Sequence, residues 1–161
     1  MITIYTDGSS LGNPGPWGRG VIVIGEPQIW EDGAMRQRKK TFVGGEDHTT
    51  NNRMELTAVI QALQFLRDQW VAEKEIGIHM DSMYVRDGIE KYLDARVARW
   101  RKLASKKPVL NQDLRAQIYE LRPHFPHIHR LRVKAHAYDP LNNEVDKLAR
   151  GEAEKIQKNL P

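Results

Sequence analysis

The chain contains no cysteine. This absence excludes disulfide bonds, thiolate catalysis and zinc sites with cysteine ligands, so any bound metal must be held by oxygen or imidazole ligands. The chain also lacks an apolar run long enough to cross a membrane, and Met1 leads directly into a predicted strand without a basic and apolar signal segment. We therefore expect a cytoplasmic protein with no membrane partner.

The composition is that of a folded protein with a small excess of positive charge. Of the 161 residues, 40% are hydrophobic, which is enough to build a core and excludes a disordered chain. No repeat, low-complexity tract or linker interrupts the sequence, so residues 1–161 are expected to form a single domain. A monomer is our expectation for the oligomeric state. The net charge of +4 leans towards an anionic partner.

The first third of the chain has the pattern of an antiparallel meander. Alternating β-branched and aromatic residues predict strands over 2–8, 19–25 and 39–45. Between the last two strands, turn residues that include Asp32 and Gly33 predict a long hairpin.

From Asn51 onwards the period of the pattern becomes helical. The apolar face of this first helix is expected to carry Val59, Leu63, Leu66 and Trp70. Further along we expect a strand over 75–80, helices over 82–93 and 111–123, a strand over 127–135 and a helix from about Asn142. This succession predicts an α/β fold in which helices cover a mixed sheet.

Four carboxylates lie where these predicted elements meet. Asp7 is expected to end the first strand, Asp81 to join a strand to a helix, and Glu55 and Asp146 to lie in the first turns of their helices. Ligands of open α/β sheets bind at the carboxyl ends of strands, which makes these positions candidates for a site. Each acid alone also has a structural explanation, as a turn former, a cap or, for Glu55 with Asn52, a capping box.

Four motifs enclose these acids, in the order TDGSSLGNPGPWG, TTNNRMEL, DSMYV and VKAHAYDPLNNEVDKLA. Together they resemble the motifs of type 1 ribonuclease H, over nearly the whole chain. The resemblance implies the ribonuclease H-like fold, a five-stranded mixed sheet flanked by helices. It also implies an endonuclease that hydrolyses the RNA strand of RNA/DNA hybrids and leaves 5′-phosphate and 3′-hydroxyl ends. By position, the family's catalytic residues fall on Asp7, Glu55, Asp81, Asp146 and His136, of which the four acids bind metal.

The chemistry of four neighbouring carboxylates gives a separate reason to expect a metal. Their charges repel one another unless a cation lies between them. Hard divalent ions with oxygen ligands suit such a cluster, so we expect two Mg²⁺ ions with substrate, with Mn²⁺ as a substitute. Two ions can activate the attacking water and stabilise the leaving oxygen at phosphorus.

A histidine in the sequence AHAYDPLNN can transfer protons at neutral pH, although it also has the ordinary reading of a surface histidine. The chain departs from the family around His136, since Ala135 stands where glycine is common, and Tyr138 and Asp139 occupy a stretch where the family often has another glycine. Met83 likewise replaces a common glutamine, so one minor-groove contact with substrate is expected to be missing.

Substrate contacts are expected in two places. Asparagines can serve as turn and cap residues, and they can also meet 2′-hydroxyls and base edges in the wide minor groove of a hybrid. The basic segment from 91 to 109 is either a solvated helix face or, as the resemblance implies, a protrusion that binds the DNA strand. The expected substrate-binding residues are Asn13, Asn51, Asn52, Arg96, Arg99, Arg101 and Lys102.

Three alternatives stay open at this point. The same motifs occur in the ribonuclease H domain of reverse transcriptases, and related acids occur in DNA-strand-transferring and exonuclease relatives of the fold. A catalytically impaired protein that only binds hybrids is the non-enzymatic alternative.

Overall fold

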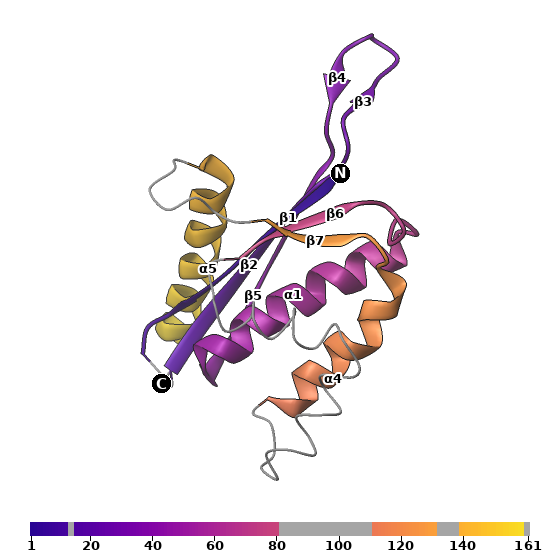
Figure 1. Ribbon diagram of the computed structural model, residues 1–161. Helices are drawn as coiled ribbons and strands as arrows, with labels where there is room; N and C mark the ends of the chain where they lie inside the picture. Colours follow the sequence, from indigo (N-terminus) through magenta and orange to yellow (C-terminus); the bar gives the residue numbers. More distant parts are fainter. Residues whose placement is uncertain (13–14, 81–110, 132–138, 160–161) are drawn as a thin grey trace.

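The computed structural model describes residues 1–12, 15–80, 111–131 and 139–159. Within this part of the chain, five strands form the main sheet in the spatial order β5-β2-β1-β6-β7 (Figure 1). Their bounds are β1 (Ile2–Ser10), β2 (Gly15–Ile24), β5 (Lys39–Thr49), β6 (Ile76–His79) and β7 (Ile128–Leu131). β2 pairs antiparallel with β1 and β5, whereas β6 pairs in parallel with β1 and β7. The predicted meander and mixed sheet are confirmed.

The connection from β2 to β5 is the predicted hairpin. It consists of β3 (Gln28–Ile29) and β4 (Met35–Arg36), which pair with each other and project away from the main sheet (Figure 1). Gly33 has a φ of +78° in the turn, a conformation that glycine adopts without strain.

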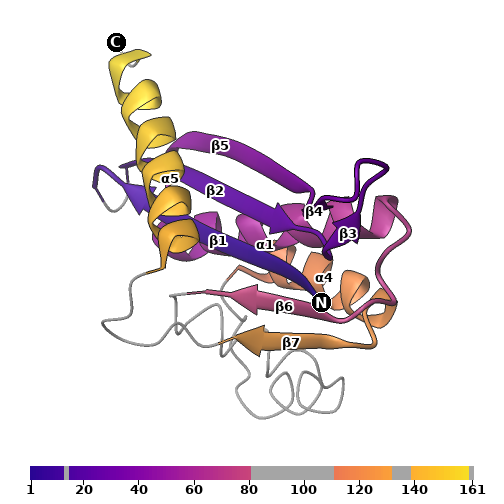
Figure 2. The ribbon, with the colours of Figure 1, turned by 90° about the horizontal axis from the view of Figure 1, so that it is seen from above.

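Helices cover both faces of the sheet. α1 (Asn51–Asp68) and α4 (Gln112–Leu121) lie on one face, and α5 (Pro140–Asn159) lies on the other (Figure 2). As predicted, Pro123 follows the end of α4, in the short 3-10 helix η1 (Arg122–His124). The helix predicted over 82–93 lies outside the described residues, as does the end of the strand predicted over 127–135.

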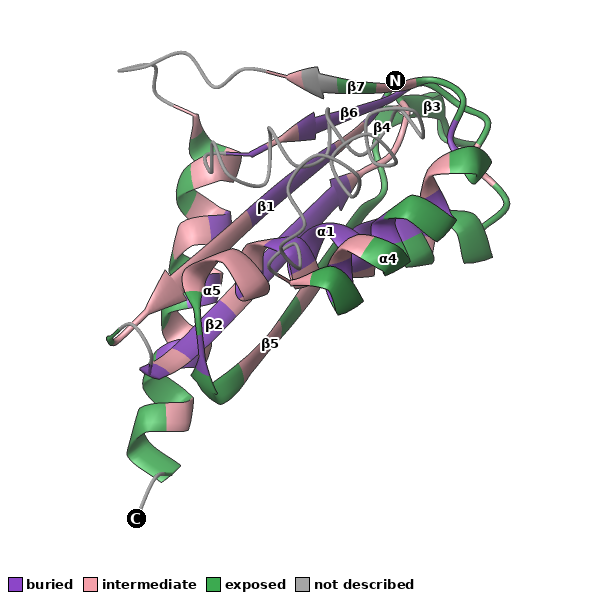
Figure 3. Ribbon diagram, turned by 60° about the horizontal axis from the view of Figure 1, so that its bottom comes forward, coloured by how far each residue is buried: buried purple, intermediate pink, exposed green. Residues whose placement is uncertain are grey.

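The two faces of the sheet are separated by the alternation of side chains along the strands. Ile4 and Val21 belong to a large core cluster with α1 and α4, whereas Tyr5 and Ile22 pack against Val145 of α5. Figure 3 shows buried positions along β1, β2 and the inner side of α1.

Two expectations about element ends were wrong. Asp7 does not end β1, because the antiparallel pairing with β2 continues through Ser10 opposite Trp17. Trp70 does not lie on the apolar face of α1, because the helix ends at Asp68 and Trp70 takes a φ of +59°. Its side chain is 95% exposed.

Candidate active site

The structure describes three of the four predicted acids, each on a different element. Asp7 lies in β1, on the face of the sheet that Tyr5 shares with α5, because side chains alternate along a strand. Glu55 lies near the start of α1 and Asp146 near the start of α5. Asp81 lies outside the described residues.

Glu55 and Asp146 lie in the second turns of their helices, not in the first turns that the sequence suggested. α1 begins at Asn51 because the Thr50 side chain accepts from the Arg53 N–H at 3.5 Å as the N-cap, so Glu55 closes no capping box with Asn52. The start of α5 likewise lies two residues before the predicted one. Proline is favoured at a first helical position, and an aspartate precedes it as cap.

Glycines bring both helices close to β1 and β2. A Cβ atom at Gly8 would lie 3.1 Å from Cγ of Glu55, so the absence of a side chain there lets Glu55 lie against the strand beside Asp7. On the other face, a Cβ at Gly20 would lie 2.9 Å from the carbonyl oxygen of Val145. Gly20 is the cross-strand partner of Asp7, so this close approach brings Asp146 to the neighbourhood of Asp7.

The approach of these acids changes the ionisation of Asp7. Burial, a hydrogen bond and charge repulsion from Asp146, and the charge of Glu55 raise the pKa of Asp7 from 3.8 to about 8. The N–H of Gly8 opposes this shift by donating to Oδ1 of Asp7 at 2.9 Å. At neutral pH the cluster therefore favours a bound proton or a bound cation.

Arg150, one turn further along α5, pairs with Asp146 at 3.3 Å. Within the described residues, no three Asp, Glu or His side chains lie close enough together to form a metal-binding group. The three described acids thus converge without forming a complete set of metal ligands.

The predicted substrate contacts are described only in part. Asn51 and Asn52 are the first two residues of α1 and are partly buried. Oδ1 of Asn51 is buried without a hydrogen-bond partner and would lie 3.7 Å from a Cβ at Gly8, next to Glu55. The remaining predicted site residues lie outside the described residues: Asn13, Arg96, Arg99, Arg101, Lys102 and His136, with the departures Met83, Ala135 and Tyr138.

Sequence analysis missed a group of polar side chains beside the acids. The rings of Tyr5 and His79 stack with centroids 4.4 Å apart, and burial raises the pKa of Tyr5, with a smaller contribution from the Asp139 carboxylate. Two signals were present. Tyr5 shares the period of Asp7, and the sequence Asp-Pro at 139–140 is typical of a helix start. The stacking itself depends on strand register, which the sequence alone does not give.

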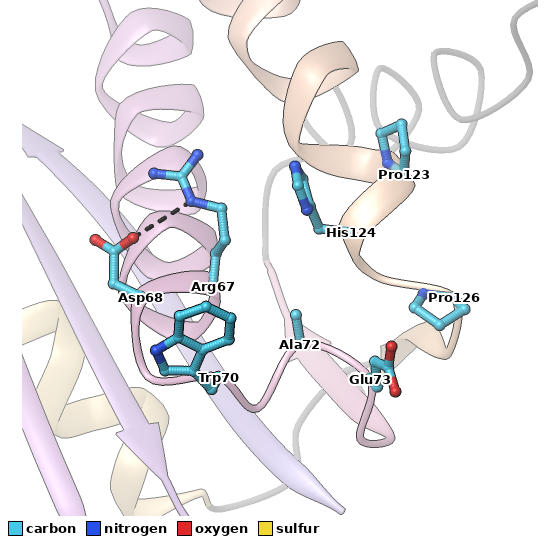
Figure 4. Close-up of a pocket in the computed structure, with 8 residues that line it drawn as sticks. All are labelled: Arg67, Asp68, Trp70, Ala72, Glu73, Pro123, His124 and Pro126. Carbon is cyan, nitrogen blue, oxygen red and sulfur yellow. Dashed lines mark hydrogen bonds and ion pairs between the residues drawn. The ribbon is translucent and has the colours of Figure 1, made fainter.

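A pocket of about 870 Å³ lies away from the acids, between the last turn of α1 and η1 (Figure 4). Its walls include Arg67, Trp70 and His124, whereas Glu55 lies near the opposite end of α1. None of the three described candidate acids, Asp7, Glu55 and Asp146, lines this pocket, so it is separate from their cluster. No helix in the described ranges is long and apolar enough to cross a membrane.

Comparisons with known proteins agree on a single family. The family model described as RNase H matches residues 1–154. A ribonuclease H of Maricaulis maris is 45% identical over 150 residues, which cover 92% of this chain and 91% of that protein. A ribonuclease HI of Caulobacter vibrioides is 43% identical over 148 residues, covering 92% of this chain and 89% of that protein.

Solved structures give the same fold. LC9-RNase H1, described as a type 1 RNase H with the type 2 active-site motif, has a TM-score of 0.75 at 25% identity, covering 96% of this chain and 72% of that chain. RNase H1 from the archaeon Halobacterium salinarum has a TM-score of 0.59 at 25% identity, covering 96% and 98%. LC11-RNase H1, solved in complex with an RNA/DNA hybrid, has a TM-score of 0.63 at 24% identity, covering 98% and 99%.

Proposed function

The chain belongs to the ribonuclease H family, and on that premise we propose that it is a single-domain endonuclease that hydrolyses the RNA strand of RNA/DNA hybrids. The products would carry 5′-phosphate and 3′-hydroxyl ends. The observation that most supports this function is that Asp146 and Glu55, from two helices on opposite faces of the sheet, both approach Asp7 closely enough to help burial raise its pKa to about 8. A cluster of this kind destabilises the folded protein unless a proton or a cation is bound, and strongly shifted pKa values are common at functional sites.

The proposed ligands of two Mg²⁺ ions are Asp7, Glu55, Asp81 and Asp146, and Mn²⁺ would be a substitute. Asp7, Glu55 and Asp146 suit such ions, because carboxylate oxygens are the ligands that Mg²⁺ prefers. A bound cation would also relieve the charge repulsion between these carboxylates. When bound, the ions would supply activation of the attacking water and stabilisation of the leaving oxygen. The N–H of Gly8 orients the Asp7 carboxylate by donating a hydrogen bond to it. The guanidinium of Arg150 forms an ion pair with the Asp146 carboxylate.

Proton transfer is assigned to His136, whose imidazole can transfer protons for the attacking water or the leaving group at neutral pH. Recognition of the RNA strand is assigned first to Asn51, a partly exposed residue at the start of α1 whose side-chain amide can exchange hydrogen bonds with a 2′-hydroxyl. The other proposed substrate contacts are Asn13, Asn52, Arg96, Arg99, Arg101 and Lys102. A monomer in the cytoplasm is proposed as the working state.

Cleavage of three labelled duplexes tests the function. RNA/DNA hybrid should be cut in its RNA strand, whereas duplex RNA and duplex DNA should stay intact, because the contacts require 2′-hydroxyls on one strand of a hybrid minor groove. Asp47→Asn, which removes an exposed carboxylate of β5, is the matched control for changes at Asp7 and should cut like the wild type. Equal cutting of duplex DNA would indicate a nuclease of another class, and binding of hybrid without cutting would indicate a binding protein.

A further inference from the structure

The outer edge of β5 is a long strand edge that no described strand covers. Within the described residues, β5 lies at one end of the five-stranded sheet and pairs only with β2 (Figure 2). It has 11 residues, whereas the described part of β7, at the opposite end, has 4. A strand edge of this length presents a row of N–H and C=O groups that can pair with another chain.

The register of β5 against β2 shows which of its backbone groups point outward. The N–H of Gly25 donates to the carbonyl oxygen of Arg38 at 2.8 Å, and hydrogen-bonded positions alternate along an antiparallel ladder. Since Arg38 faces β2, the even-numbered residues from 40 to 46 face it too. The odd-numbered residues from 39 to 45 therefore direct their N–H and C=O groups away from the sheet. Val43, whose side chain is 43% exposed, is one of them.

The charges on this strand complement a second, antiparallel copy of the same strand. Lys39 and Lys40 begin β5, and Glu46 and Asp47 lie near its end. When two copies pair about Val43, Lys40 of each copy lies opposite Glu46 of the other, and Lys39 lies opposite Asp47. Opposite charges at directly paired positions stabilise a sheet. The strand thus carries on one edge both halves of a two-fold symmetric contact.

Two further observations favour this register. Pairing centred on the neighbouring residues Phe42 or Gly44 would place no lysine of β5 opposite an acid of β5. Within the described residues, Lys40 and Glu46 have no ion-pair partner in their own chain, whereas Lys39 pairs with Glu144 at 2.7 Å. Lysines on a strand edge discourage pairing with strands in general. Acids at the other end make this edge selective for its own antiparallel copy.

We propose that β5 is a self-association edge, through which two copies of the chain pair antiparallel about Val43 into one sheet with five strands from each copy. One strand from each copy is a small contact, at or below about 1,200 Å². Association is therefore weak, with a dissociation constant of about 10 to 100 µM, and the dilute protein is a monomer. β2 lies between β5 and β1, so Asp7 takes no part in the pairing, and the inference does not depend on the proposed function.

A charge exchange followed by sedimentation equilibrium, from about 1 to 300 µM protein at low ionic strength, tests the contact. The wild type should move from the mass of a monomer towards that of a dimer, and high salt should weaken this association. Lys40→Glu alone and Glu46→Lys alone place like charges opposite each other, so each should raise the dissociation constant about tenfold or more. A mixture of the two variants should associate at least as well as the wild type, because each strand then meets opposite charges.

The matched control is a mixture of Lys40→Glu with Glu120→Lys. Glu120 is exposed on α4, so this mixture has the same total charge as the first one but no matched strand edge. It should associate no better than Lys40→Glu alone.

Single cysteines test the register by a second route that does not change the charge pairs at 40 and 46. The chain has no cysteine of its own, so a short bifunctional maleimide can join Val43→Cys only to the same residue of a second copy. Val43→Cys should crosslink efficiently, because the two copies of this residue are direct partners. Lys39→Cys is the control on the same strand, since its two copies would lie about 26 Å apart.

Three results would overturn the proposal. The first is a wild type that stays monomeric up to about 300 µM at low salt. The second is a charge-matched mixture that associates no better than the control mixture, with circular dichroism confirming that the variants are folded. The third is equal crosslinking at positions 43 and 39, which would indicate random encounters. The cysteine variants decide the question if a charge variant fails to fold, and loss of hybrid cleavage would refute the proposed function without affecting any of these measurements.

Discussion

The two faces of the sheet hold their helices in different ways. On the α1 face, a large cluster of buried apolar side chains from β1, β2, β6, α1 and α4 packs together with Phe125. On the α5 face, the buried apolar cluster is small, and glycines of β2 let the helix backbone come into direct contact with the strand. The α1 face therefore supplies most of the hydrophobic stabilisation, whereas the α5 face carries Asp7 and Asp146 at short range.

The strongest test of this division is Asp7→Asn on the α5 face. It removes a proposed metal ligand, so cleavage of hybrid should fall by about a thousandfold or more, equivalent to about 4 kcal/mol in the activation barrier. Rates are measured at saturating Mg²⁺ beside Asp47→Asn. Activity within tenfold of the wild type would remove Asp7 from the chemistry.

The opposite case is Leu63→Ala on the α1 face, where the leucine is 3% exposed. The cavity should lower the free energy of unfolding by about 3 kcal/mol. Because Leu63 lies two turns beyond Glu55, kcat measured well below the melting temperature should stay unchanged. Urea unfolding and cleavage rates check the two halves of this expectation, and a large drop in kcat would mean that the core and the site are not separable.

A third test concerns the close contact of α5. Gly18→Ala would place a Cβ 1.8 Å from the carbonyl oxygen of Ala149, so the helix must move and unfolding should become easier by about 2 to 3 kcal/mol. Metal affinity should fall as well, since Asp146 moves with the helix.

The control for Gly18 is a glycine within α5 itself. A Cβ at Gly151 meets no atom within 4 Å, so Gly151→Ala should raise the free energy of unfolding by about 0.5 to 1 kcal/mol through helix propensity. Equal effects at the two glycines would contradict the importance of the close contact.

A further test concerns the dependence of stability on pH without metal. The folded-state pKa of Asp7, about 8, lies above its ordinary value of 3.8, so the folded protein binds a proton that the unfolded chain releases between these pH values. Stability associated with Asp7 is therefore full below about pH 4 and is lost as the pH rises through 8.

Asp7→Asn does not ionise and should escape this loss. At pH 8 the variant should be more stable than the wild type by on the order of 2 kcal/mol, and the difference should vanish near pH 4. Thermal unfolding in chelator across this range measures the difference, and Mg²⁺ should reduce it. A constant difference at every pH would show that the substitution acts through packing instead.

The sequence predicted the order of elements because hydrophobic period and turn residues are local. It placed the start of α1 correctly at Asn51 but the start of α5 two residues too late, and it named the wrong candidate cap for α1, because several residues near each start can cap a helix. Thr50 rather than Asn52 serves in one case and Asp139 in the other. Trp70 was assigned to a core face because its spacing is helical, although the helix ends before it.

The acids could be identified from the sequence because they lie within recognisable motifs. The sequence did not show why these acids come together in the fold. That reason lies in contacts between distant segments, such as Glu55 against Gly8 and α5 against Gly20. The stack of Tyr5 on His79 depends on parallel register, which follows from the whole sheet. Asp81 and His136, outside the described residues, stay predictions.

The β3–β4 hairpin makes the protein suitable for insertion of foreign sequence. Its two strands pair with each other, and the last pair of β2 with β5, Ile24 with Lys39, holds the sheet at its base. Residues at the turn, around Gly33, are exposed and project away from the main sheet (Figure 1). A peptide tag or a second folded module inserted there would lengthen a loop whose closure entropy grows only slowly with length. A fluorescent label at this turn would likewise report tumbling and binding from a position remote from the acids.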